Sequence, residues 1–113
     1  MPNNLSLKTA LLLRDAGWPQ GGLMLGWGYH GDCLMLDTLN SFTEKDNSGD
    51  VPCAAPTTDE LLAALPHGTC LTKFESRFHA DWHGKGLLLF RNESSPVEAL
   101  ASLWLALRKE KII

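Results

Sequence analysis

The clearest hydrophobic pattern lies near the C-terminus and predicts an amphipathic helix. Ser95 stands where an N-cap belongs, Pro96 follows at the first helical position, and Glu98 completes a capping box. The apolar residues that follow fall within about 120° of helical arc, the width of a stripe that faces a core. They are Val97, Leu100, Leu103, Trp104 and Leu107.

Another helix is predicted near the N-terminus, from Ser6 to about Ala16. Ser6 is a favourable N-cap, because its hydroxyl can accept a hydrogen bond from a free backbone N–H of the first turn. The chain then continues with Gly17, Trp18 and Pro19. This order is typical of a helix C-terminus, since glycine adopts the left-handed conformation and proline prevents continuation.

The leucines of this N-terminal helix do not form one stripe. At about 100° per residue, Leu7 and Leu11 lie on one side, whereas Leu12 and Leu13 point away from them. Such a helix is covered on more than one side, either by a loop of the same chain or by a second copy. Leu12 and Leu13 are therefore the predicted interface anchors if the chain forms a homodimer or another homo-oligomer.

Apolar side chains alternate with glycine-rich positions from Gly22 to His30, which predicts a β-strand. Gly31 and Asp32 then form a two-residue turn into an apolar strand over residues 33–37, so the segment is predicted to be a β-hairpin. The glycines leave one face bare. We favour a helix or an aromatic ring packed on that face over a ligand groove.

The middle of the chain combines a polar loop with a short helix. Residues 40–50 are rich in turn formers and predict a mobile surface loop. Thr57 and Glu60 have the spacing of a capping box, which predicts the start of a helix. Pro66 and Gly68 then mark its end.

Residues 70–82 alternate between two sets and predict one long, half-buried strand that bends near Ser76. The predicted inner set is Cys70, Thr72, Phe74, Ser76, Phe78, Ala80 and Trp82. The predicted outer, solvated set is Lys73, Glu75, Arg77, His79, Asp81 and His83. Residues 83–86 turn the chain into a further strand over residues 87–91.

Together these elements predict an α+β fold in the order α-β-β-α-β-β-α. Two hairpins form an antiparallel sheet of about four strands, and three helices cover one of its faces. A chain of 113 residues fits a single domain spanning residues 1–113.

Charge and composition exclude several classes of partner. The net charge is −3; residues 1–68 carry 3 basic and 8 acidic side chains, and residues 69–113 carry 7 and 5. This balance argues against nucleic acid as the main partner. The apolar runs at 10–13 and 103–107 are far shorter than the roughly 20 residues that span a bilayer, so no membrane partner is expected. Three cysteines and a start without a secretory signal predict a cytoplasmic protein.

Two groups of residues have the chemistry of metal ligands. His79, Asp81 and His83 project from one face at strand spacing and could bind zinc or iron, although a solvated strand face explains them better. Two His-x-x-Cys pairs, at residues 30–33 and 67–70, could supply four zinc ligands, although both sit at turns that lead into strands. We therefore expect no metal and no other cofactor.

Catalytic motifs are missing from the sequence. It contains neither a phosphate-binding glycine loop nor a Gly-x-Ser-x-Gly nucleophile elbow. Cys53 has no basic residue near it in the sequence that would lower its pKa. Asp37, Asp81 or a histidine could serve acid–base chemistry, but nothing in the sequence pairs them. The expectation is therefore a protein that is not an enzyme.

Three segments resemble small uncharacterised proteins encoded by bacteriophages and prophages: residues 6–20, 54–66 and 93–107. These segments cover the three predicted helices. The resemblance implies a bacterial host cytoplasm and no particular activity or site residue. The sequence therefore predicts an accessory protein of phage or prophage type that binds an unknown protein partner or itself; the alternative is a metal-binding protein or metal-dependent enzyme.

Overall fold

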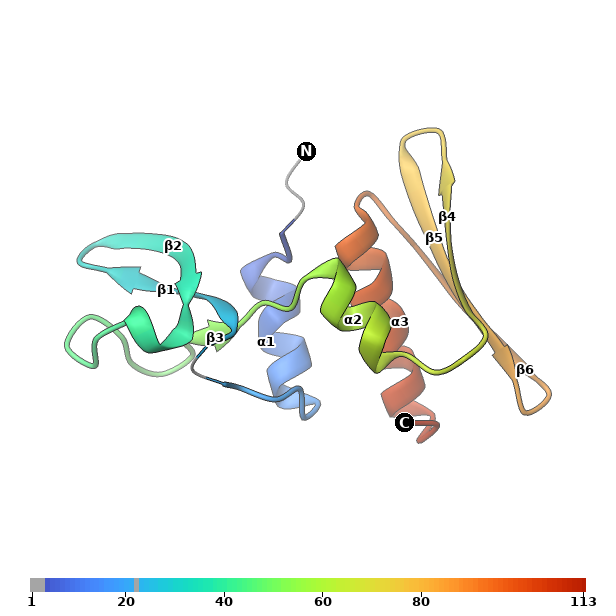
Figure 1. Cartoon of the computed structure of the whole chain (residues 1–113), viewed down its shortest axis with the longest axis horizontal. Helices are drawn as coiled ribbons and strands as arrows, with labels where there is room; N and C mark the ends of the chain where they lie inside the picture. The colour runs from blue at the N-terminus through green and yellow to red at the C-terminus, as the bar shows by residue number, and fades with distance from the viewer. Residues whose placement is uncertain (1–3, 22) are drawn as a thin grey trace. The chain divides into compact units, whose positions relative to one another are not determined.

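The computed structural model describes residues 4–21 and 23–113, in two compact units (Figure 1). The N-terminal unit comprises residues 6–56, and the C-terminal unit comprises residues 57–113 together with residues 4 and 5. Each unit combines helix and sheet. The expectation of a single domain stays a prediction, because two compact units can still unfold as one cooperative domain.

The N-terminal unit holds one helix, a three-stranded sheet and a short 3-10 turn. Its sheet has the strand order β2-β1-β3, and both pairings are antiparallel. The elements are α1 (Leu7–Asp15), β1 (Leu25–His30), β2 (Cys33–Thr38), η1 (Leu39–Ser41) and β3 (Cys53–Ala54).

The predicted boundaries of α1 are confirmed within about one residue. The Ser6 hydroxyl accepts a hydrogen bond from the Thr9 N–H at 3.3 Å. Gly17 adopts a φ of 103°, and the Trp18 N–H returns to the Leu13 carbonyl at 2.9 Å. These bonds satisfy backbone groups that a helix end would otherwise leave free.

Close packing on the glycine face of β1 is also confirmed. A Cβ on Gly28 would lie 2.7 Å from the Phe42 ring, and a Cβ on Gly26 would lie 2.6 Å from the Cys53 carbonyl oxygen. A ring and a neighbouring backbone therefore occupy the space that side chains would need. The predicted hairpin turn at Gly31 and Asp32 is present; Gly22 lies outside the described residues.

The loop over residues 40–50 is held to the sheet by Asn47. Its side-chain oxygen accepts from the Tyr29 N–H at 2.6 Å, and its amide group donates to the Tyr29 carbonyl at 2.9 Å. The Asn47 side chain therefore satisfies the same pair of backbone groups that a neighbouring strand would bond.

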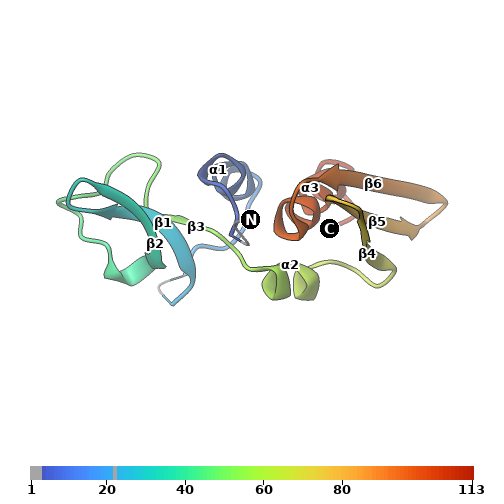
Figure 2. The ribbon, with the colours of Figure 1, turned by 90° about the horizontal axis from the view of Figure 1, so that it is seen from above.

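The C-terminal unit holds two helices and a second antiparallel sheet, of order β4-β5-β6. Helix α3 packs against β5 and β6 and covers one face of this sheet (Figure 2). The elements are α2 (Thr58–Ala64), β4 (Thr69–Phe74), β5 (Arg77–Gly84), β6 (Leu87–Glu93) and α3 (Pro96–Lys109).

Both helices of this unit begin as the sequence predicts. The Thr57 and Glu60 side chains form the reciprocal capping box, and the Ser95 hydroxyl accepts from the Glu98 N–H at 3.2 Å. All five residues of the predicted stripe on α3 are buried. The core of the unit lies between this stripe and the sheet face that carries Ala80 and Trp82.

The prediction of one long strand over residues 70–82 is wrong. The chain instead turns back at Glu75 and Ser76, and Phe74 pairs with Arg77 across this two-residue turn. Glu75 adopts the left-handed conformation, with a φ of 48°. A two-residue turn places the residues on either side of it on the same sheet face.

This turn corrects the predicted faces as well. Cys70, Thr72 and Phe74 share a face with His79 and the other outward residues of β5 rather than with Ala80 and Trp82, and Lys73 lies on the opposite face. Cys70 and Phe74 of β4 therefore point away from α3, whereas Leu71, which pairs with Ala80, lies on the face towards it. The turn was not visible in the sequence, because apolar residues continue to alternate at every second position through residues 75 and 76.

The α+β class is confirmed, whereas the single sheet of about four strands is wrong. The structure has two three-stranded antiparallel sheets and the order α-β-β-β-α-β-β-β-α over the described residues. One additional strand, β3, contains two residues, too few to give a periodic signal. The other arises where the predicted long strand divides into β4 and β5.

Candidate functional site

The face of the β4-β5-β6 sheet that points away from α3 is the best candidate for a functional site. We call it the outer sheet face. The pairing register places on it alternate residues of all three strands, and α3 covers the opposite face, where Ala80 and Trp82 are buried. Its members are Cys70, Thr72, Phe74, Arg77, His79, Asp81, His83, Leu88, Phe90 and Asn92.

His79 stands at the centre of this face and is held from four sides. Its Nδ1 lies 2.8 Å from Asn92 Oδ1, and its Nε2 lies 3.3 Å from Asp81 Oδ2. The Phe90 ring stacks on it at a centroid distance of 5.5 Å, and the Phe74 ring meets it edge-on at 6.1 Å. These contacts fix the orientation of the imidazole.

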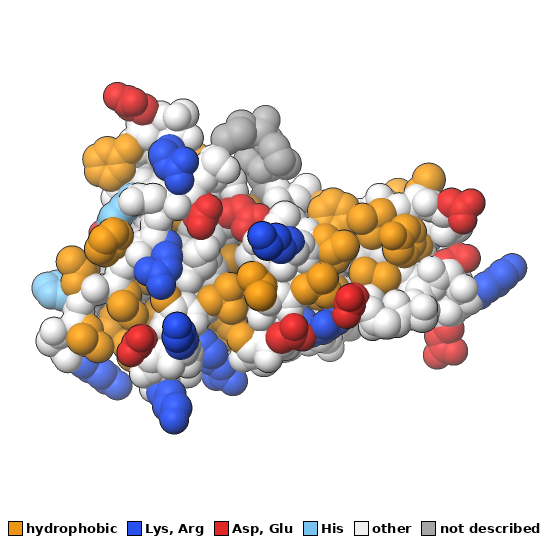
Figure 3. All heavy atoms as spheres, turned by 180° about the vertical axis from the view of Figure 1, so that it is seen from behind, with side chains coloured by type: hydrophobic (Ala, Val, Ile, Leu, Met, Phe, Trp, Pro, Cys, Tyr) orange, Lys and Arg blue, Asp and Glu red, His pale blue; other side chains and the backbone are white. Residues whose placement is uncertain are grey.

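Large apolar side chains surround this polar centre and remain in contact with solvent. Phe74 is 59% exposed, Leu88 is 58% exposed and Phe90 is 50% exposed. A shallow hollow of about 710 Å³ lies between β4, β5 and β6 and is lined in part by Arg77 and Asn92. Figure 3 shows apolar, basic and histidine side chains mixed over this part of the molecule, at the left of the view.

Strand β6 has apolar residues on both of its faces. Leu87 and Leu89 lie on the face towards α3, and Leu88 and Phe90 lie on the outer sheet face. A strand that is apolar on both faces is typical of a sheet that is covered on both sides. One cover is α3; the second face has none within the described part of the C-terminal unit.

Of the three candidate metal ligands, the structure brings two together. His79 contacts Asp81, whereas His83 is exposed and pairs with Leu88 further along the sheet. Within residues 4–21 and 23–113, no group of three His, Cys, Asp or Glu side chains is arranged to hold a metal ion.

The two His-x-x-Cys pairs do not combine either. His30 pairs with Cys33 across the β1–β2 turn in the N-terminal unit, whereas His67 and Cys70 belong to the C-terminal unit. The His30 ring is directed to Asp37 instead, with its Nε2 3.1 Å from the Asp37 carboxylate. The contact of His30 with Asp37 was not predictable from the sequence, because it depends on the twist and register of β1 against β2. His79 and Asp81, by contrast, were expected to share one strand face.

His30, Asp37 and Ser41 resemble the residue set of a hydrolase, but their geometry differs from that of a catalytic triad. Asp37 and Ser41 both approach the same ring nitrogen of His30, at 3.1 and 3.4 Å. In a triad the carboxylate and the hydroxyl contact opposite ring nitrogens. The Ser41 hydroxyl donates to the Thr38 carbonyl at 2.7 Å, so this cluster ties the end of β2 to η1.

Asp37 gives this cluster an acid-sensitive contribution to stability. The Thr38 N–H, and after it the His30 ring, bond the carboxylate and lower the pKa of Asp37 below its ordinary value of 3.8. Because the folded state holds the carboxylate ionised, the stabilisation is present above pH 3.8 and is lost as the pH falls through the lower folded-state pKa.

The stability difference between the native chain and Asp37→Asn should therefore shrink as the pH is lowered towards about 2. Denaturant unfolding followed by circular dichroism at a series of pH values measures it. Asp32→Asn, at the exposed turn of the same hairpin, is the control for loss of one carboxylate. A difference that is independent of pH would contradict the assigned role of the Asp37 carboxylate.

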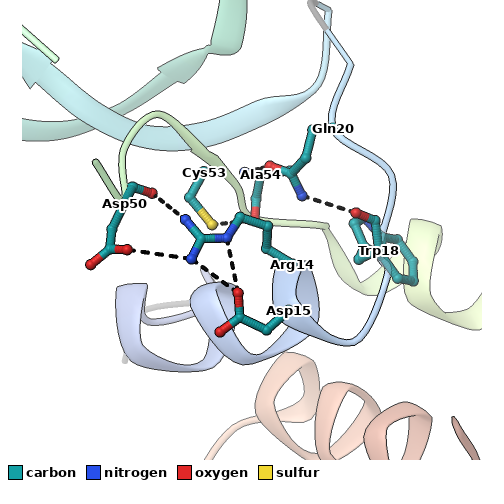
Figure 4. Close-up of polar contacts among 7 residues, drawn as sticks. All are labelled: Arg14, Asp15, Trp18, Gln20, Asp50, Cys53 and Ala54. Carbon is teal, nitrogen blue, oxygen red and sulfur yellow. Dashed lines mark hydrogen bonds and ion pairs between the residues drawn. The ribbon is translucent and has the colours of Figure 1, made fainter. Parts of the chain in front are cut away.

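Cys53 does have a basic residue near it, contrary to the sequence-based expectation. Arg14 lies beside it in the fold and bonds the Asp50 carbonyl at 2.9 Å and the Asp15 carboxylate at 3.0 Å (Figure 4). Burial nevertheless raises the pKa of the Cys53 thiol, and this effect outweighs the attraction of Arg14. The fully buried thiol therefore has the properties of a structural cysteine.

Close by, Gln20 joins the chain after α1 to β3. Its side-chain oxygen accepts from the Ala54 N–H at 2.7 Å, and its amide group donates to the Trp18 carbonyl at 3.0 Å (Figure 4). Gln20 thus ties the segment before β1 to β3, and Arg14 ties α1 to the segment before β3. These contacts hold the fold together and do not form a catalytic or binding site.

The two predicted interface anchors occupy different environments. Leu13 is fully buried, whereas Leu12 is 50% exposed. The two side chains therefore do not form one exposed surface on α1. Whether Leu12 contacts a partner stays a prediction, and the larger exposed apolar surface is the outer sheet face, which sequence reasoning missed because it overlooked the turn at Glu75.

No protein-family model, curated protein or solved structure matches this chain. The resemblance to phage and prophage proteins therefore rests on the three sequence segments alone. In the part of the chain that the structure describes, no helix combines the length and apolar character needed to cross a bilayer.

Proposed function

We propose that this chain is a non-enzymatic interaction module that binds a protein partner through the outer sheet face. The observation that carries the proposal is the exposure of Phe74, Leu88 and Phe90, each at least half exposed on one sheet face. Exposed apolar side chains gathered on one face typically mark an interaction surface.

The composition of the face supports a protein partner. Aromatic residues and arginine are enriched at the centres of protein interfaces, and a polar group among them fixes the register of the partner. The aromatic and arginine residues of this face are Phe74, Phe90 and Arg77. The polar group among them is His79, which is oriented by Asn92 and the two phenylalanine rings.

The wider setting of the proposal comes from the sequence. The resemblance of three segments to phage and prophage proteins favours an accessory protein that acts in a bacterial cytoplasm. The metal-binding alternative has weaker support, since His79 and Asp81 lie together without His83. An enzymatic role lacks an activated nucleophile at either His–Asp contact.

The test is capture of proteins from a bacterial lysate with the native chain and with Phe90→Ser. The substitution removes an exposed apolar side chain and its stacking on His79. We expect Phe90→Ser to bind the proteins that the native chain captures, including added copies of the chain itself, at least about tenfold more weakly. This is the usual effect of removing an interface hot spot.

Leu23→Ser is the matched control, because Leu23 is 85% exposed and belongs to the N-terminal unit, whereas the outer sheet face belongs to the C-terminal unit. It should retain the same proteins as the native chain. The proposal is wrong if Phe90→Ser retains them as well, or if the native chain binds neither another protein nor itself.

A further inference from the structure

The charged side chains along β5 change sign about His79. On one side lie Glu75, in the turn, and then Arg77; on the other side lie Asp81 and then His83. Alternate residues of a strand are about 6.6 Å apart, so Arg77 and Asp81 lie at equal distances from His79 in opposite directions. Basic Arg77 and acidic Asp81 therefore flank His79 symmetrically, and we call these two residues the charged row.

This order is complementary to itself when the two β5 strands are antiparallel, but not when they are parallel. If two copies pack face to face with their β5 strands antiparallel, a two-fold axis across the strands passes between the two His79 residues. Arg77 of each copy then lies opposite Asp81 of the other. With parallel β5 strands, Arg77 would face Arg77 and Asp81 would face Asp81, which is repulsive.

Phe74 and Cys70 fit the same arrangement. On β4, Phe74 pairs with Arg77 and Cys70 pairs with Asp81, so the two-fold axis places Phe74 of one copy against Cys70 of the other. Leu88 and Phe90 on β6 extend the apolar surface beyond the charged row. Two sheets that pack through such faces bury their side chains in a layer about 10 Å thick.

We propose that the outer sheet face is the interface of a homodimer with antiparallel, face-to-face β5 strands, held by two reciprocal contacts between Arg77 and Asp81. This inference rests on the proposed function and names the partner as a second copy of the chain. The interface is isologous, so each favourable contact occurs twice.

Charge-exchange variants test this arrangement. Arg77→Asp places two acidic pairs across the interface, and Asp81→Arg places two basic pairs there. Each variant alone should dimerise at least about tenfold more weakly than the native chain, as expected for like charges brought into contact. An equimolar mixture of the two should form a heterodimer, because both contacts then join opposite charges again. Sedimentation equilibrium measures the dissociation constants.

The mixture separates an interface effect from a folding effect. Asp81→Arg also removes the contact with His79, but a misfolded variant could not restore dimers when mixed with Arg77→Asp. Lys85→Asp is the control for net charge, because Lys85 is exposed in the β5–β6 turn and outside the charged row. This control should dimerise like the native chain.

Three results would overturn the homodimer: a native chain that stays monomeric at roughly 1 mM, single variants that dimerise normally, or a mixture that fails to associate. A different outcome would overturn the proposed protein-binding function. If the native chain is monomeric but captures other proteins in a way that depends on Phe90, the homodimer is wrong and the interaction module stands. If neither self-association nor capture depends on the outer sheet face, both are wrong.

Discussion

Leu13→Ala is expected to lower the free energy of unfolding by about 2–5 kcal/mol, the usual cost of removing a buried leucine side chain. Leu13 is fully buried in α1, and its backbone carbonyl accepts the Trp18 N–H that closes the helix. The loss combines the transfer free energy of the removed methyl groups with the cost of the cavity that they leave. Against a typical total stability of about 5–15 kcal/mol, this change is large.

Leu12→Ala is the matched control, because it makes the same substitution at the next position of the same helix. Leu12 is 50% exposed, so its truncation should cost well under half as much. Chemical denaturation of both variants measures the difference. Equal losses would mean that Leu12 is also covered in solution, which would support the interface that the sequence predicts on α1.

Gly26→Ala should disrupt the pairing between β1 and β3 and cost about 3 kcal/mol, the upper end for overpacking. A Cβ at this position would lie 2.6 Å from the Cys53 carbonyl oxygen and would also collide with a methyl group of Leu39. Gly26 pairs directly with Ala54, so the obstacle is the backbone of the neighbouring strand. A backbone held in a sheet cannot move aside without breaking its hydrogen bonds.

The same substitution at two further glycines provides comparisons for this result. At Gly28 the obstacle is the side chain of Phe42, which can rotate, so Gly28→Ala should cost less than Gly26→Ala. At Gly21 the nearest atom is the Met24 sulfur at 3.4 Å, so Gly21→Ala should be nearly neutral. Thermal unfolding of the three variants tests the order. A Gly26→Ala variant as stable as Gly21→Ala would contradict the close β1–β3 packing.

Much of the secondary structure was predictable from the sequence, because the responsible interactions are local. The caps at Ser6, Thr57 and Ser95 each involve a backbone group three residues away, and all three form. The stripe on α3 follows from helical spacing alone and is buried throughout. The β1–β2 turn is equally local, since Gly31 supplies the positive φ that a tight turn needs.

The candidate site was only partly predictable. The sequence singled out His79 and Asp81, and the fold brings them together, but as two neighbours on a surface rather than as part of a three-ligand metal site. It missed Phe74, Phe90 and Asn92, which complete the surroundings of His79. Glu75 and Ser76 lack the glycine or asparagine that usually marks a two-residue turn, so no local signal in the sequence separated β4 from β5.

The sequence by itself determined where the helices begin and end, which residues of α3 face the core, and that alternating segments form strands. These properties depend on bonds and spacings within a few residues. The tertiary structure alone decided the division into two sheets and the face on which Phe74 lies. It also decided the contacts of His30 with Asp37 and of Arg14 with Asp50. The physical reason is that side-chain alternation continues unchanged through a two-residue turn, so only the pairing of strands determines which residues share a face.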